Sequence, residues 1–263
     1  MTNLPASNAF NLIDELNELD ASDRVDELKL QRILNEAEKL NELEDRYMIT
    51  GICHCIKGDV ARAFSNLDAA YDTNPEEYIF DAYLKTAIRL NVENKAYKKA
   101  SLATKTVFSA SVALFAVRVL INCNDFSGAR DAIELYEKAY ANQGDIMERL
   151  NENTDFDKDV IKEIGQLDFD FKYLSLITRN IMDYALDAFN IALTDKDVEI
   201  IPDDITVISS KLGFTGASQS QIKKLDDFAI EQLIEYETST DTRKFVFHLT
   251  NQSDTEQTDT LAS

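Results

Sequence analysis

Residues 46–75, RYMITGICHCIKGDVARAFSNLDAAYDTNP, contain the pattern that decides the fold. Apolar and small residues recur at helical spacing, Lys57 and Gly58 interrupt them, and a second helical run follows. Pro75 then ends the second run, because proline cannot continue a helix. The segment therefore predicts two helices joined by a short turn, an antiparallel helical hairpin.

The predicted hairpin has small residues where its two helices would touch. Gly51 lies in the first helix, and Ala63 and Ala70 lie in the second. Small side chains at such positions let two helix backbones approach closely, while Tyr47 and Leu67 fill the space beside them. One hairpin of this kind cannot bury its whole apolar face, so the pattern favours a stack of several.

The hairpin resembles the tetratricopeptide repeat, a helical hairpin with a period of about 34 residues. Thr50 and His54 depart from the family pattern, which has leucine and an aromatic residue at those positions. The residues that carry the resemblance are Tyr47, Gly51, Ala63, Leu67, Ala70 and Pro75.

Weaker copies of the second-helix pattern follow along the chain. They comprise Ala132, Tyr136 and Ala139, then Ala185, Phe189 and Ala192, and a degenerate copy with Ala100, Thr104 and Val107. The register of the copy near residue 132 could also be set on Ala129. The resemblance implies a mainly α fold, an array of antiparallel helical hairpins (a tetratricopeptide-like solenoid) over residues 44–195. Residues 1–43 are expected to form N-terminal helices.

The pattern changes again near residue 196. β-Branched residues on both sides of Pro202 predict two short strands, residues 220–236 have helical spacing, and residues 244–249 alternate like a strand. We expect a small α+β element over residues 196–250, which either caps the helical array or has an activity of its own. Residues 251–263 lack an apolar pattern and are expected to be a disordered tail.

The composition limits the classes of partner. Asp and Glu number 48 against 27 Lys and Arg, for a formal net charge of -21. Nucleic acids and anionic membranes are disfavoured as partners, because both need a basic surface. A basic protein would be attracted to the chain.

The cysteines and the apolar segments predict a cytoplasmic protein. Cys53, Cys55 and Cys123 lie in apolar, helical sequence, as buried free thiols of a reducing compartment do. The N-terminus has no basic segment followed by an apolar core, so no signal peptide is expected. The most apolar run, residues 112–121, is too short to span a membrane and contains Arg118.

Several residue groups resemble chemical sites only in part. Asp155, Asp157 and Asp159 have the spacing of a calcium loop, but the glycine and the glutamate that the loop needs are missing. Residues 53–55, Cys-His-Cys, cannot converge on one ion within a helix, because consecutive side chains point about 100° apart. No glycine-rich phosphate loop occurs. The sequence therefore predicts no catalytic residues, no metal site, no cofactor and no enzymatic activity.

The resemblance implies where a partner would bind. In tetratricopeptide arrays the first helices of the hairpins line a concave groove that holds a peptide or a helix. The expected partner-binding residues are Met48 and Ile52, Lys85 and Arg89, and Leu114 and Arg118. An apolar entrance and a cationic centre would suit a ligand with apolar anchors and carboxylates. The cations Lys85 and Arg89 also have a local explanation that needs no partner. Asp81 with Lys85, and Arg89 with Glu93, have the spacing of ion pairs on a helix surface.

Two functions follow from these expectations. The first is a non-enzymatic protein–protein interaction adaptor or assembly factor that binds another protein or peptide through the groove. The alternative is an acidic inhibitor, antitoxin or immunity protein, or a nucleic-acid mimic, that neutralises a basic partner such as a nuclease. Self-association is compatible with both.

Overall fold

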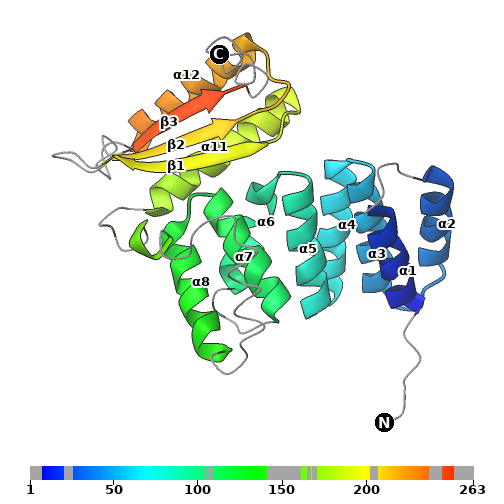
Figure 1. Cartoon of the computed structure of the whole chain (residues 1–263). Helices are drawn as coiled ribbons and strands as arrows, with labels where there is room; N and C mark the ends of the chain where they lie inside the picture. Colours follow the sequence, from blue (N-terminus) through cyan, green and yellow to red (C-terminus); the bar gives the residue numbers. More distant parts are fainter. Residues whose placement is uncertain are drawn as a thin grey trace, which may run out of the picture. The chain divides into compact units, whose positions relative to one another are not determined.

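The computed structural model describes residues 8–20, 26–103, 105, 109–140, 161–164, 167, 171–201, 207–236 and 245–251 (Figure 1). The chain is mainly helical, with a small three-stranded sheet near its C-terminus. It divides into two compact units, Met1–Leu90 and Asn91–Ser263. The acidic loop with Asp155, and residues 252–263 of the expected tail, lie outside the described residues.

The first unit is built from consecutive packed helices. They are α1 (Asn8–Asp20), α2 (Glu27–Ala37), α3 (Leu43–Ile56), α4 (Val60–Thr73) and α5 (Glu77–Arg89). Helix α3 contacts each of the other four helices, most extensively α4. This central place explains why α3 is buried on several sides.

Helices α3 and α4 form the hairpin expected from the sequence, and Gly51 is its closest point. A Cβ atom on Gly51 would lie 2.8 Å from Leu67 Cγ and 3.1 Å from the Ala63 carbonyl oxygen. Both distances are shorter than ordinary van der Waals contact, so no larger residue fits without a shift. Ala63, Leu67 and Ala70 are fully buried, which confirms that they are packing residues.

Polar contacts fix the exit of this hairpin. The Tyr78 hydroxyl donates to Asp45 at 3.0 Å, and the Asn74 amide donates to Glu44 at 3.1 Å. These bonds join the α4–α5 connection, through Asn74, and the first turn of α5, through Tyr78, to the first turn of α3. The chain after Pro75 is therefore held against the start of α3, and α5 begins from that fixed point.

The second unit combines helices with the sheet. Its described elements are α6 (Glu93–Ala103), α7 (Ala110–Asn122), α8 (Phe126–Ala139), α11 (Phe171–Phe189), β1 (Asp195–Ile201), β2 (Val207–Gly213), α12 (Gln219–Tyr236) and β3 (Phe245–Thr250). Strand β2 is central, antiparallel to β1 and parallel to β3. The strands on both sides of Pro202, the following helix and the last strand are those expected from the sequence.

One face of the sheet is covered by α11 and α12 (Figure 1). Ile177 and Ala185 of α11, Leu212 of β2 and Leu225 of α12 share one buried core. The alanine pattern that begins at Ala185 was expected to mark another hairpin. That expectation is wrong, because α11 ends before Ala192 and its apolar face packs on the sheet.

The turns before α4, α6 and α8 repeat at a fixed interval. Gly58, Asn91 and Asn124 all have a positive φ, at 72°, 53° and 58°, and each is separated from the next by 33 residues. Glycine and asparagine adopt this left-handed conformation more easily than other residues. The three helices that follow begin at equivalent positions, Val60, Glu93 and Phe126.

The same interval shows which alanines have equivalent positions in α4, α6 and α8. Ala96 and Ala129 occupy the position of Ala63, and all three are fully buried. Setting the register on Ala100 or Ala132 therefore begins the pattern about one helical turn too late. The exposure of Ala139 agrees, because a residue in the place of Ala70 would be buried.

A buried asparagine joins the helices of the second unit to its sheet. The Asn124 amide nitrogen donates to Thr178 Oγ1 at 2.8 Å and to Ser210 Oγ at 3.0 Å. Thr178 belongs to α11 and Ser210 to β2, and all three residues are buried. The turn between α7 and α8 is thereby held against the sheet, which brings the end of α7 close to β1.

All three cysteines are buried thiols, as expected, and none forms a disulfide. Burial raises the pKa of Cys55 to about 11. No helix in the described ranges is long and apolar enough to cross a membrane.

Candidate functional site

The structure places the six expected partner-binding residues in different environments. In the first unit, Met48 is buried in the core, Ile52 is half-buried, and Lys85 and Arg89 are exposed on α5. In the second unit, Leu114 and Arg118 are half-buried on α7. Met48 therefore contributes to packing rather than to the surface.

The 33-residue interval relates three of these residues. Ile52, Lys85 and Arg118 are each separated by 33 positions, so they occupy the same place in α3, α5 and α7. Arg89 lies one helical turn later. The Lys85 ammonium is 2.6 Å from the Asp81 carboxylate, which is the local ion pair that the sequence also suggested.

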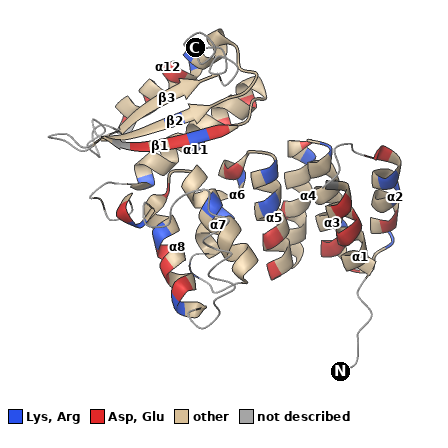
Figure 2. Cartoon of the chain, in the orientation of Figure 1, with Lys and Arg blue, Asp and Glu red and all other residues tan. Residues whose placement is uncertain are grey.

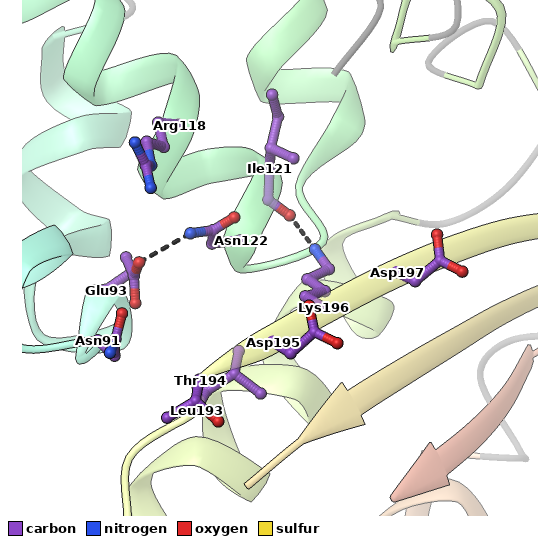
Figure 3. Close-up of a pocket in the computed structure, with 10 residues that line it drawn as sticks. All are labelled: Asn91, Glu93, Arg118, Ile121, Asn122, Leu193, Thr194, Asp195, Lys196 and Asp197. Atoms are coloured by element: carbon purple, nitrogen blue, oxygen red, sulfur yellow. Dashed lines mark hydrogen bonds between the residues drawn. The ribbon is translucent and has the colours of Figure 1, made fainter. Parts of the chain in front are cut away.

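Arg118 lines a cavity of about 350 Å³ in the second unit (Figure 3). The cavity lies where the end of α7 and the start of α6 face β1. Its lining consists of Asn91, Glu93, Arg118, Ile121, Asn122, Leu193, Thr194, Asp195, Lys196 and Asp197.

Glu93 places a carboxylate inside the protein at the first residue of α6. Only 3% of the residue is exposed, and its Oε1 accepts a hydrogen bond of 2.7 Å from the Asn122 amide. Burial raises the pKa of Glu93, because the charged carboxylate loses its hydration, while Asn122, Arg118 and Lys196 oppose the shift. The position at a helix N-terminus is one where a negative charge is favourable.

Lys196 reaches the cavity from β1. Its ammonium group donates to the main-chain carbonyl of Ile121 (Figure 3). The same group lies 5.2 Å from the ring centroid of Phe126. Burial lowers the pKa of Lys196 to about 7, and the neighbouring Cys123 and Glu93 partly offset this effect. The amine is therefore able to exchange a proton near neutral pH.

The two acidic neighbours of Lys196 lie on the other face of its strand. Successive side chains of a strand alternate between the two faces, so Asp195 and Asp197 point opposite to Lys196. Both are exposed, and Asp197 is 3.6 Å from Lys211 of β2. Figure 2 shows this run of acid, base and acid along β1. The charged residues that line the cavity are Glu93, Arg118, Asp195, Lys196 and Asp197.

Sequence reasoning found Arg118 and missed the other members of the site. Glu93 was treated as a surface partner of Arg89, whereas it is buried and bonded to Asn122. Lys196 lies between two aspartates, which is typical of a solvated segment. The burial of Glu93 is linked to the repeated turn, because Asn91 has the same backbone conformation as Gly58 and places Glu93 at the first residue of α6.

Metal ligands do not gather in the described part of the chain. No group of three or more histidine, cysteine, aspartate or glutamate side chains there is placed to hold an ion. His54 Nδ1 lies 3.7 Å from Asp59, and burial lowers the pKa of this histidine. Asp155, Asp157 and Asp159 are outside the described residues.

Comparison of the chain with protein-family models, with curated protein sequences and with solved structures finds no significant match in any of the three.

Proposed function

We propose that the chain is a non-enzymatic adaptor that binds another protein through the first helices of tetratricopeptide-like hairpins. The observation that supports this most is the 33-residue interval between Gly58, Asn91 and Asn124. It gives three helix pairs the same turn conformation and the same buried alanine, as expected for units of one repeat. Repeat arrays of this type commonly serve as binding surfaces.

Within the first unit, the equivalent residues Ile52 and Lys85 suggest the chemistry of the partner. One is apolar and the other is cationic, in a chain whose formal net charge is -21. A segment with an apolar anchor and a carboxylate would match them. Met48 is left out of this surface because only 1% of it is exposed.

The decisive experiment compares two lysines that have similar surroundings. The Lys85 side chain is 51% exposed beside Asp81, and the Lys138 side chain is 78% exposed beside Glu134 on α8, a second helix. Affinity capture from the native host, with mass spectrometry, would use the wild-type chain, Lys85→Glu and Lys138→Glu. The adaptor proposal expects one partner to be lost with the α5 variant and retained with Lys138→Glu.

A second candidate function rests on the acidic face of β1. Asp195, Asp197 and Glu199 are exposed there, although Lys211 lies between the last two, 3.6 and 3.7 Å from them. An inhibitor of a basic protein would bind through such charges. Its partner would be lost as salt is raised and would still bind the α5 variant, so the same capture at low and high salt separates the two functions.

A further inference from the structure

The sheet of the second unit ends at β3, and this strand has the features of an edge that can pair. Among the described strands only β2 pairs with β3. Residues 245–250, FVFHLT, contain no proline, lysine, arginine, aspartate or glutamate, and their pairing with β2 has no bulge. Natural sheets use such charges, prolines and bulges to protect an exposed edge. The other edge strand, β1, is protected, because Asp195, Asp197 and Glu199 are exposed on it.

Two residues of β3 direct their main-chain groups away from β2. Main-chain hydrogen-bonding groups alternate between the two sides of a strand. The Thr250 carbonyl oxygen accepts a hydrogen bond of 2.9 Å from the N–H of Phe214, directly after β2, so Thr250 and His248 point towards β2. Phe247 and Leu249 alternate with them, and their N–H and C=O groups therefore point to the open side. A further strand could bond there.

Helix α12 exposes apolar side chains beside this edge. It packs next to α11 and against β3 (Figure 1). Gln232 of α12 accepts a hydrogen bond of 2.6 Å from Asn180 of α11. Ile230 and Ile234 are each two residues from Gln232, which places them about 200° around the helix from it, on the flank away from α11. They are 54% and 63% exposed.

We propose that the chain forms a two-fold symmetric dimer in which β3 pairs in antiparallel orientation with β3 of a second copy. With the axis at His248, Phe247 of each copy lies opposite Leu249 of the other. Both residues contribute to the core under α11 and α12, so apolar side chains meet on that face. The two α12 helices then lie side by side and cover Ile230 and Ile234. This proposal does not depend on the adaptor function.

The charges of the two edges favour β3 for self-pairing. A symmetric pair of β1 strands would place the carboxylates of Asp195, Asp197 and Glu199 opposite one another, which is destabilising. Two copies with a formal charge of -21 each still repel as whole molecules. Because salt screens this repulsion, the dimer should become tighter as the ionic strength rises. A dimer that weakens with salt would contradict this interface.

Sedimentation velocity of the full chain at increasing concentration tests the dimer. We expect a reversible equilibrium between monomer and dimer. Ile230→Ser with Ile234→Ser should raise the dissociation constant at least about tenfold, because the flank of α12 then has less apolar surface to bury. Leu28→Ser, at a leucine of α2 that is 85% exposed, should leave the constant unchanged. A chain that stays monomeric, or a double variant that dimerises like the wild type, overturns the proposal.

Cysteine substitution tests the position of the axis. The two His248 residues would form a non-hydrogen-bonded pair with Cα atoms about 4.5 Å apart, a separation that a disulfide spans. His248→Cys should therefore crosslink two chains under mild oxidation, since the three native cysteines are buried. Val246→Cys, on the same face of β3, would lie opposite Thr250 and should not crosslink. Equal crosslinking of both variants would indicate random collision and overturn the proposed pairing.

Hydrogen exchange of the wild-type chain needs no variant. The amides of Phe247 and Leu249 would bond to the second copy, so they should exchange more slowly as the protein concentration rises. The amide of His248 points towards β2 and should not respond. Exchange at Phe247 and Leu249 that is independent of concentration overturns the proposal. None of these results affects the Lys85 capture experiment.

Discussion

The buried asparagine at the α7–α8 turn should contribute more to stability than its counterparts at the earlier turns. Asn124 combines a left-handed backbone, with φ of 58°, and two hydrogen bonds to buried hydroxyl groups. Gly58 has the same kind of backbone, with φ of 72°, and a Cβ atom there would meet nothing within 4 Å. Replacing each residue by alanine therefore separates backbone strain from the loss of buried hydrogen bonds.

The magnitudes follow from these two terms. Alanine in a left-handed conformation costs about 1–2 kcal/mol, so Gly58→Ala should destabilise the first unit by about 1 kcal/mol after the gain in chain stiffness. Asn124→Gly keeps the backbone relaxed and loses two hydrogen bonds of about 1 kcal/mol each. Asn124→Ala combines both losses and should cost about 3 kcal/mol.

Urea unfolding followed by far-UV circular dichroism measures these differences, with Asn91→Ala as a third alanine variant at the equivalent turn. We expect Asn124→Ala to be the least stable, and Asn124→Gly to lie between it and the wild type. If Asn124→Gly unfolds within about 0.5 kcal/mol of the wild type, which is the usual range of neutral substitutions, the hydrogen bonds do not stabilise the unit. If Gly58→Ala is the more damaging alanine variant, the assignment of the two terms is wrong.

Three further outcomes are expected. Gly51→Ala should destabilise the first unit by about 1 kcal/mol in urea unfolding. Overpacking against Leu67 costs about 1–3 kcal/mol, and the higher helix propensity of alanine offsets about 1 kcal/mol of this cost. An unchanged midpoint would show that α3 and α4 separate freely. The pKa of Lys196 is lowered to about 7 in the folded chain, against an ordinary value of 10.5. Between these two pH values the unfolded chain binds one more proton than the folded chain, so the stability of the wild type relative to Lys196→Met should rise with pH over that interval. Equal slopes for both chains would contradict the burial of this amine. The raised pKa of Glu93 gives the opposite pH dependence, because the folded chain keeps its proton to a higher pH than the unfolded chain does. The stability of the wild type relative to Glu93→Gln should therefore fall as the pH rises above the usual glutamate pKa of 4.5, as measured by thermal unfolding at several pH values. A relative stability that rises instead would show that Asn122 outweighs burial.

The hairpin and the terminal strands could be predicted because their signals are local. Gly51 and Leu67 are 16 positions apart on two successive helices, and their contact follows from spacing alone. The strands on both sides of Pro202 are revealed by β-branched residues and a turn. The register in α6 was not decidable in this way, because Ala96, Ala100 and Ala103 are all alanines on one buried face.

The cavity could not be predicted because its members are distant in sequence. Glu93 of α6 and Lys196 of β1 line one cavity, next to the α7–α8 turn that Asn124 holds against α11 and β2. The segment around Lys196, with an aspartate on each side, alternates between two faces of a strand, and composition does not show which face is covered. The half-buried position of Lys196, with its amine on the Ile121 carbonyl, is therefore a property of the folded second unit and not of its local sequence.

The equal spacing of Gly58, Asn91 and Asn124 has a consequence for how such a chain can change in length. A cut and join between two adjacent turns would remove or add a block of 33 residues and would meet the same backbone conformation on both sides. A chain that lacked residues 59–91 would pass from the turn at Gly58 into Val92 and α6 with the helix beginning in register. A deletion or duplication between adjacent turns would therefore remove or add two helices, the second helix of one pair and the first helix of the next, and keep the turn conformation.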